Sequence, residues 1–273
     1  MTIRNGNPAI RALLAVVLLF SALLALSPFV YMVLVSFTQK TTLSLSFNPA
    51  EFSLVNYRRV FQNFDIGRNA LNSFIVTGSA CILNCIISAM AAYVFAKKHF
   101  PMRDQLFAVY LATQMIPGQV TLIPVFTIIK ALGLMNTYPA LFLPIINAFG
   151  VFLIRQFMVS VPDDLIEAAR IDGCSEVGIF VRIVLPLVKP VLISLTIFTF
   201  ITSWNDFLWP LVIVTKPEMK TLTLALAALK GSYSTNYGLV MAGSTLAFLP
   251  PFILYVLLQK EFVEGIALSG IKG

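Results

Sequence analysis

The sequence predicts an all-α fold: a polytopic membrane protein with six transmembrane helices. Of the 273 residues, 58% are hydrophobic and 11% are charged, whereas soluble domains average about 45–50% and about 25%. Thirty of the 31 charged residues lie outside six windows, and every window is longer than the roughly 20 residues that a helix needs to cross a bilayer. The windows are 12–39, 69–96, 105–129, 131–154, 190–215 and 231–259. A soluble enzyme and a disordered chain are excluded.

The loops predict the orientation of the chain. An even number of spans places both termini on one side of the membrane. That side carries 11 Lys and Arg residues and the other side carries 8. Because cytoplasmic loops hold the excess of basic residues, we expect both termini to be cytoplasmic. This topology accounts for the net charge of +7, and no basic stretch interleaved with aromatic residues indicates nucleic-acid binding.

The first two windows have different characters. The first follows Arg4 and Arg11, but its apolar stretch exceeds the roughly 7–15 residues of a signal-peptide core, so we expect a retained helix. The second, about 70–96, is rich in Ser, Ala, Gly and Asn, which suits close packing between helices. Cys81 and Cys85, at i and i+4, fit the same packing role.

Prolines concentrate in the third and fourth windows. Membrane helices tolerate proline where neighbouring helices or water satisfy the freed backbone groups. These residues therefore predict either kinked helices around an aqueous path or prolines at helix ends without a further role. They are Pro117, Pro124, Pro139 and Pro144, and Pro250 and Pro251 pose the same question in the sixth window.

The loop between the fourth and fifth spans holds nine of the 31 charges, within residues 155–189. Ser160, Pro162 and Asp163 form a helix-start signal, and Gly173 supplies a terminator. We expect one short helix over 164–172 and a second amphipathic stretch over 175–184, ended by Pro186. The first helix would place small and acidic side chains on one face, either for docking to a partner or as a helix lying on the membrane. That face would hold Leu165, Ala168, Ala169 and Asp172.

This loop resembles the EAA loop of ABC-importer permeases. The similarity lies in Glu167-Ala168-Ala169, Asp172-Gly173, Ile183-x-Leu185-Pro186 and Pro190. Further similarity to carbohydrate permeases of the maltose type, the smaller six-span subunit in particular, lies in Asn72-Ser73, Leu153-Ile154-Arg155-Gln156-Phe157, Trp204-Asn205-Asp206-Phe207-Leu208-Trp209-Pro210 and the ending Gln259 to Gly273. The likeness covers about residues 10–273.

The resemblance implies one permease domain, 1–273, with a cytoplasmic coupling loop at 160–187. Glu167 would offer a charge-assisted contact to a separate ATPase subunit, Ala168 and Ala169 a close fit, and Asp172-Gly173 the turn that follows. The tail 261–273 would also reach the ATPase, through Gly270, Lys272 and Gly273, or else be a flexible exposed end.

The resemblance also implies the assembly. A second permease, two ATPase subunits and an extracytoplasmic sugar-binding protein would join this chain in the inner membrane of a bacterium or archaeon. No cofactor is expected in this chain, because ATP and Mg²⁺ would be bound by the ATPase. The sequence itself has no phosphate-binding Gly-x-x-x-x-Gly-Lys-Ser/Thr loop, no metal-ligand spacing and no nucleophile beside a base.

Asp206 is the one charge inside a predicted span. Sixteen residues after Pro190, it would lie about 24 Å along a helix, where it should face water or a polar partner. Trp204, Asn205 and Trp209 surround it in the sequence. Two interpretations stay open: these residues line a sugar path, or they form an interfacial belt in which Asp206 ties helices together. Gln114, Gln119 and Asn147 are further candidates for the same path.

The favoured function is a permease subunit of an ATP-driven, binding-protein-dependent sugar importer. The nearest alternative is the same role for glycerol phosphate or another polyol. A stand-alone secondary carrier would need several ionisable residues in its spans, and only Asp206 is present. A membrane enzyme would need a catalytic group, and none is expected.

Overall fold

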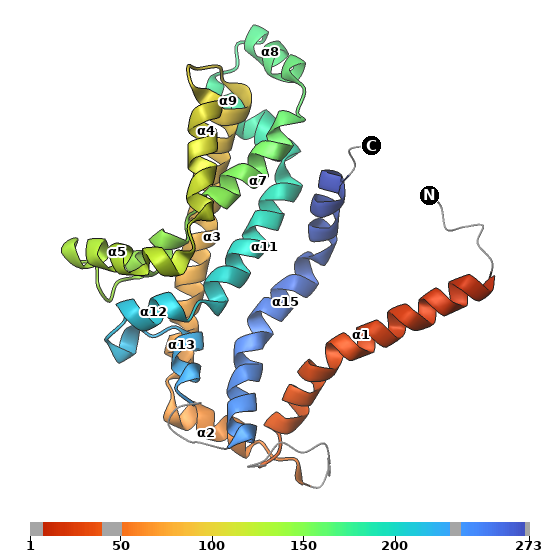
Figure 1. The fold of residues 1–273 in the computed structure, drawn as a ribbon, viewed down its shortest axis with the longest axis vertical. Helices are drawn as coiled ribbons and strands as arrows, with labels where there is room; N and C mark the ends of the chain where they lie inside the picture. The colour runs from red at the N-terminus through yellow and green to blue at the C-terminus, as the bar shows by residue number, and fades with distance from the viewer. Residues whose placement is uncertain (1–7, 40–50, 230–235, 271–273) are drawn as a thin grey trace. The chain divides into compact units, whose positions relative to one another are not determined.

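The computed structural model describes residues 8–39, 51–229 and 236–270 (Figure 1), with the backbone alone for Pro8 and for 261–270. Regular structure in these segments is helical, and no β-strand occurs among them. The predicted all-α fold is therefore confirmed. The chain divides into two compact units, Met1–Asp65 with Leu226–Phe248, and Ile66–Ala225 with Leu249–Gly273.

Three helices in the described part of the chain are continuous and apolar enough to cross a membrane: α1 (Pro8–Ser36), α3 (Ile66–Lys97) and α15 (Tyr237–Gly270). Three further stretches are bent at a short break, by 99°, 48° and 77°. They are α4 (Arg103–Ala112) with α5 (Gly118–Ala131), α6 (Tyr138–Phe142) with α7 (Ala148–Val159), and the stretch from α9 (Glu176–Ile179) to α10 (Leu185–Leu187) with α11 (Lys189–Asn205). The count is six spans only if each bent pair forms one span.

The predicted kinks in the third and fourth spans are confirmed, and two prolines account for them. Ile116, between the short turn η3 (Thr113–Met115) and α5, is extended with φ −84° and ψ 117°, because the ring of Pro117 disfavours helical backbone in the residue before it. Pro144 lies in the short turn η4 (Leu143–Ile145), and extended backbone follows before α7. Pro124 and Pro139, by contrast, lie within α5 and in the first turn of α6.

The fifth window is not one helix as expected, because α11 ends at Asn205. Asp206 is extended, with φ −66° and ψ 120°, and α12 (Leu208–Ile213) follows. In an unbroken helix the N–H of residue 210 would bond to the Asp206 carbonyl. Pro210 has no N–H and its ring would clash with that carbonyl, so the helix breaks here. In α15, Pro250 and Pro251 lie inside the helix.

Small and polar side chains join α3 to α11, as the composition of the second window predicts. Thr77 and Ser203 hydroxyls lie 3.1 Å apart, and Asn84 donates to Thr199 at 2.9 Å. Cys85 Sγ lies 3.3 Å from the Thr196 hydroxyl, so the cysteine packs between helices as expected. In a bilayer such hydrogen bonds and close contacts hold helices together.

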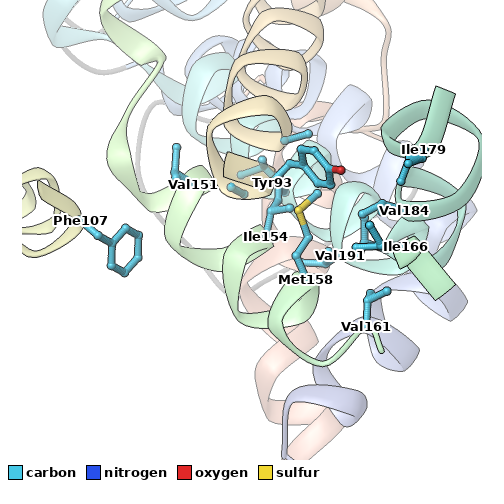
Figure 2. Packing of buried hydrophobic residues seen from close by; sticks show 14 of the residues in the cluster. Tyr93, Phe107, Val151, Ile154, Met158, Val161, Ile166, Ile179, Val184 and Val191 are labelled. Carbon is cyan, nitrogen blue, oxygen red and sulfur yellow. The ribbon is translucent and has the colours of Figure 1, made fainter. Parts of the chain in front are cut away.

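A hydrophobic core joins α3, α4, α7 and α11 to the loop between the fourth and fifth spans (Figure 2). It includes Tyr93 of α3, Ile154 and Met158 of α7 and Val191 of α11, all buried. Ile166 of α8 (Asp163–Ile171) belongs to the same cluster. The loop is therefore packed onto the spans rather than held away from them.

At the opposite end of α3, asparagine side chains fix the connecting segments. Asn72, which is buried, donates to the carbonyls of Glu218 and Lys220 at 2.8 and 2.9 Å and accepts from the Tyr138 hydroxyl at 2.8 Å. Asn136 accepts from the N–H groups of Thr215 and Lys216 at 2.7 and 2.9 Å. These bonds satisfy backbone groups that no helix pairs. The turn η6 (Pro217–Met219) and α13 (Leu222–Ala227) are held by them and by Ser73, which accepts from Leu222 N–H at 2.8 Å.

In the other unit, α2 (Val55–Asn63) closes the end of α1. Asn56 donates to the carbonyls of Ser36 and Thr38 at 3.0 and 2.7 Å, which would otherwise be unpaired at the C-terminus of α1. The backbone at Gly238, in the first turn of α15, approaches Thr38 and Asn56 so closely that a Cβ atom would overlap both. Glycine is required there for the close approach.

Gly150 of α7 offers a test of the packing against α3. A Cβ atom at Gly150 would overlap Ser88 Oγ, which is held by a hydrogen bond to Asn84 at 3.1 Å. We expect Gly150→Ala to cost about 1–3 kcal/mol of stability, lowering the midpoint of thermal unfolding in detergent by about 2–4 °C for each kcal/mol. Gly78→Ala on α3, where an added methyl meets nothing within 4 Å, is the control and should be neutral or stabilising. Equal effects at both sites would contradict this packing.

Candidate docking loop and membrane cavity

The loop between α7 and α11 folds as two helical pieces, of which the second is bent by 77° relative to α11. The first is α8, and the second runs from α9 through a π-helical turn, η5 (Phe180–Val184), to α10. Two helices were expected here. The predicted cap Ser160 is wrong, however: its hydroxyl donates to the Phe157 carbonyl at 2.7 Å, and Pro162 holds the N-cap position of α8 without a side-chain cap.

Gly173 ends α8, as predicted. Its φ is +79°, in the left-handed region that glycine enters without a steric penalty. The N–H groups of Gly173 and Cys174 bond back to the carbonyls of Arg170 and Ala169 at 3.0 and 2.9 Å. Ser175 then caps α9 by accepting from Gly178 N–H at 3.2 Å. The turn between the two helical pieces is thus fully specified by hydrogen bonds.

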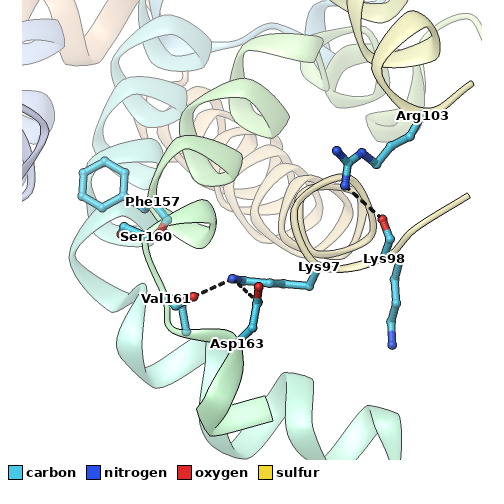
Figure 3. A network of polar contacts seen from close by, with 7 residues as sticks. All are labelled: Lys97, Lys98, Arg103, Phe157, Ser160, Val161 and Asp163. Atoms are coloured by element: carbon cyan, nitrogen blue, oxygen red, sulfur yellow. Dashed lines mark hydrogen bonds and ion pairs between the residues drawn. The ribbon is translucent and has the colours of Figure 1, made fainter. Parts of the chain in front are cut away.

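A buried lysine anchors the start of α8 (Figure 3). Lys97, the last residue of α3, is 3% exposed in its side chain, whereas its partner Asp163 is 72% exposed. Lys97 Nζ donates to Asp163 Oδ1 at 2.7 Å and to the Val161 carbonyl at 2.5 Å. The hydrogen bond from Lys97 lowers the pKa of the Asp163 carboxyl, with the charge of Lys97 adding to the effect.

Glu176 anchors the second piece. Its carboxylate pairs with Lys98 and with Arg170, the latter at 3.1 Å, and accepts from the Tyr93 hydroxyl at 3.1 Å. These partners, Lys98 first, lower the pKa of Glu176. Both helical pieces are therefore attached to the last two turns of α3 by a carboxylate and a basic residue.

The outer surface of the loop differs from the predicted face in one residue. Ala169 is buried with Ile166 in the hydrophobic core, so it cannot belong to a docking face together with Ala168. Leu165, Ala168 and Asp172 of the predicted face are exposed, and so are Glu167 and Gly173. Ile171 and Val177 are 86% and 72% exposed.

A second candidate site is a cavity of about 440 Å³ at the breaks of the third, fourth and fifth spans. Three residues predicted for a substrate path, Gln119, Asn147 and Asp206, lie together in its wall. The full lining is Gly118, Gln119, Thr121, Leu122, Val125, Pro144, Ile145, Asn147, Thr202, Asp206, Leu208 and Trp209.

Asp206 faces this cavity and also caps α12. Its Oδ1 accepts from the N–H of Trp209 at 3.3 Å, one of the unpaired donors at a helix start. The Trp209 indole in turn donates to the Ala140 carbonyl at 2.8 Å. Asp206 thus ties α11 to α12, and Trp209 ties α12 to α6.

The other predicted path residues lie elsewhere. Trp204 is 1% exposed and packs against the rings of Phe74 and Phe200, and Asn205 is exposed and outside the cavity lining. Gln114, with its amide oxygen toward α7, accepts from the N–H groups of Ala148, at 3.2 Å, and Phe149. Asn147 also accepts from Phe149 N–H at 3.0 Å.

Some site residues were not predicted. Thr202 lines the cavity without any signal in the sequence, whereas Trp209, which also lines it, is one of the residues expected beside Asp206. Lysines in a basic turn are usually exposed, and nothing in the sequence predicted that the Lys97 side chain is buried.

Within the described residues no three His, Cys, Asp or Glu side chains could hold a metal ion. Of the predicted tail contacts, Gly270 ends α15, and Lys272 and Gly273 lie outside the described residues.

Replacing Lys97 with Met should loosen the loop. The change leaves the Val161 carbonyl without its donor and Asp163 without its cation, at a cost of about 1–3 kcal/mol. The mobility of a spin label on native Cys174, which is exposed, would measure the effect at neutral pH. Asp164→Asn, the loss of an exposed carboxylate in the same helical turn, is the control and should leave the spectrum unchanged.

Lowering the pH should loosen the loop of the unaltered protein in the same way as Lys97→Met. The pKa values of the Asp163 and Glu176 carboxyls are lowered in the folded loop. Their ion pairs therefore stabilise the loop fully at a pH above the ordinary carboxyl pKa of about 4. This stabilisation is lost as the pH falls through the lowered pKa values. The label should therefore be unchanged between about pH 8 and 5 and become mobile below about pH 4. A spectrum that changes between pH 8 and 6 would show that these two ion pairs do not hold the loop.

Comparisons with known proteins agree with the loop and the broken spans. The family described as "Binding-protein-dependent transport system inner membrane component" matches residues 85–267. This chain is 35% identical to the arabinooligosaccharides transport system permease protein AraQ of Halalkalibacterium halodurans, over 99% of each chain. It is 33% identical to the lactose transport system permease protein LacG of Rhizobium radiobacter, over 94% of each.

A further relative is the sn-glycerol-3-phosphate transport system permease protein UgpE of Salmonella typhi, 39% identical over 72% of this chain and 71% of that one. Among solved structures, a chain of a bacterial ABC transporter that imports the acidic polysaccharide alginate matches with a TM-score of 0.80 and 24% identity, over 96% of this chain and 99% of that one. The matched fold, the family match over two thirds of the sequence and the full-length relatives agree. The chain belongs to the family of binding-protein-dependent transport system inner membrane components.

Proposed function

We propose that this chain is a permease subunit of an ATP-driven carbohydrate importer, which couples to a separate cytoplasmic ATPase through the loop 160–187. The observation that carries the proposal is the anchoring of that loop. Two carboxylates, Asp163 and Glu176, fix it to the basic end of α3, while Glu167 and Ala168 are exposed on its outer side. A rigid projection with a charged and small-residue surface suits docking into a protein cleft.

The assembly follows from the family. In this proposal a second permease completes the pathway, two ATPase subunits bind ATP and Mg²⁺, and an extracytoplasmic binding protein delivers the sugar. This chain holds no ATPase site of its own. Both termini and the loop are then cytoplasmic, and the tail 261–273 extends toward the ATPase. Relatives named for arabino-oligosaccharides and lactose support an oligosaccharide as the cargo.

Force would reach the spans through the core. Four buried residues of the loop share one hydrophobic cluster with residues of α3, α7 and α11, so a pull on the loop acts on packed side chains of three spans. They are Ile166 and Ala169 of α8, Ile179 of α9 and Val184 of η5. Packed interiors resist compression and transmit strain. The ATPase would in this way move the spans without any contact to the cargo.

Glu167→Ala should weaken the ATPase contact. A hydrogen bond to a charged group contributes about 1.5–3 kcal/mol, so we expect the affinity for the ATPase to fall about 10-fold to 100-fold. Co-purification of the ATPase and ATP-dependent uptake of arabinotriose in proteoliposomes measure the effect. Glu218→Ala, the same change at an exposed glutamate of η6, is the matched control. Unchanged affinity and uptake in Glu167→Ala would count against the docking role of this residue.

Gly173→Ala should uncouple transport by straining the turn after α8. A left-handed backbone costs a non-glycine residue about 1–2 kcal/mol, and no neighbouring atom lies within 4 Å of the added methyl. Gly133→Ala is a matched control, because Gly133 has φ +69° and equally open surroundings in the turn after α5. The strain is similar, yet only Gly173→Ala should lower uptake per ATP hydrolysed. Gly173→Asn should restore coupling in part, since Asn tolerates this conformation. Equal losses in the two alanine variants would show a general stability effect.

A further inference from the structure

We propose that the cavity at the span breaks is a subsite for neutral, hydroxyl-rich ligands, and that Asp206 excludes anionic ones from it. The inference rests on the proposed function, because it assigns a cargo class to a site within the same permease. Its volume of about 440 Å³ is within the range of about 300–1,000 Å³ typical of small-molecule sites. Its wall combines apolar side chains with a few polar ones, which is the usual composition of such sites.

The charge of the wall is the first argument. Asp206 is the single charged residue among the twelve that line the cavity, and none of these twelve is Lys, Arg or His. Sites that bind phosphate or carboxylate place a basic side chain or several free N–H groups at the anion. Here an anion would meet a carboxylate with no cation beside it. The same field would repel it at a distance, because fixed charges in apolar walls are weakly screened.

The hydrogen-bonding capacity of the wall is the second argument. The Thr121 and Thr202 hydroxyls already donate to the Gly118 and Phe198 carbonyls, at 3.0 and 2.8 Å. Their oxygens therefore remain as acceptors, and a carboxylate such as that of Asp206 is an acceptor only. A ligand that fits this surface has to donate hydrogen bonds. Sugar hydroxyls donate and accept, whereas phosphate and carboxylate groups at neutral pH largely accept.

Donors are available for the remaining ligand oxygens. Asn147 uses its Oδ1 to cap α7, accepting from Phe149 N–H at 3.0 Å, which leaves its NH₂ group to donate. Gln119 adds a second amide. Acceptors and amide donors are what the hydroxyls of a neutral sugar ring require.

The test measures the sign of the potential directly in the assembled complex. Thr121→Cys introduces a thiol of similar size into the cavity wall. Its rates of reaction with cationic methanethiosulfonate ethyltrimethylammonium and anionic methanethiosulfonate ethylsulfonate are compared with those of a free thiol in solution. We expect the normalised ratio of the cationic rate to the anionic rate to be about 10, because the unit negative charge of Asp206 is nearby. The native Cys174, which is exposed in the loop, is followed in the same sample by peptide mass.

Two variants change the charge in opposite directions without removing a cap. Asp206→Asn keeps an acceptor for α12, since Asn and Asp cap helices equally well, and should bring the ratio to within about twofold of unity. Asn147→Asp keeps the cap of α7 and should raise the ratio further. The ratio at Cys174 should stay constant in both. A ratio in the starting protein near unity, or one that Asp206→Asn leaves unchanged, would overturn the role of Asp206.

Protection of the same thiol tests the ligand class. Arabinotriose should slow labelling, whereas trigalacturonate at the same concentration should not, and Asp206→Asn should reduce this difference. Equal protection by both, or protection by neither, would overturn the assignment of the subsite. Uptake of arabinotriose by the same preparation tests the proposed function separately, because labelling needs no transport. If the complex imports arabinotriose but shows none of these labelling effects, the subsite is contradicted and the proposed function is not. If the labelling effects are present but the sugar is not imported, the proposed function is contradicted.

Discussion

Backbone hydrogen bonding inside a bilayer is the constraint on which the membrane part of this fold depends. Hydrocarbon offers no partner to a free N–H or C=O group, yet the third, fourth and fifth spans of this chain are interrupted between α4 and α5, between α6 and α7 and between α11 and α12. At two of these breaks polar side chains meet the free donors of the next helix: Gln114 and Asn147 at α7, and Asp206 at α12. The polar residues of the cavity are therefore there first to satisfy the backbone. The breaks and the cavity have a single physical origin.

α3 connects this region to the docking loop. It is continuous over 32 residues, its buried Asn72 holds the segment before α13, and its last residue, Lys97, holds α8. Between these ends its Thr77 and Asn84 side chains bond to α11, and Gly150 of α7 packs against its Ser88. A straight helix fixed to its neighbours along its whole length gives the bent spans and the loop a common frame.

The sequence could predict the spans, the kinks in the third and fourth of them and the loop with its Gly173 terminator, because these depend on local properties: hydropathy, proline and a required positive φ. It did not predict which side of α8 is buried, since that is decided by contacts with α3 and α7, distant in the sequence. Ala169 and Ala168 are adjacent and chemically identical, and only packing distinguishes them. The break after Asn205 did have a local signal, Pro210, but it was masked by the apolar run around it. Trp204 and Trp209 flank Asp206 at similar distances in the sequence and both are buried, but only Trp209, which follows the break, also lines the cavity.

Helix capping explains why an oxygen acceptor occupies position 206, but it does not explain a charge there. Asn caps a helix as well as Asp does, and Asn147 performs that task at α7 in the same cavity wall. A carboxylate within a membrane span costs about 2.5–3.5 kcal/mol on insertion scales, and an amide would avoid most of this cost. An amide oxygen can accept the bond from Trp209 N–H as well as a carboxylate can, so this bond does not by itself require a charge. The charge of Asp206 therefore needs a second use, and the cavity that it faces, lined by hydroxyl and amide groups and by no cation, offers one: attraction of hydrogen-bond donors and repulsion of anions.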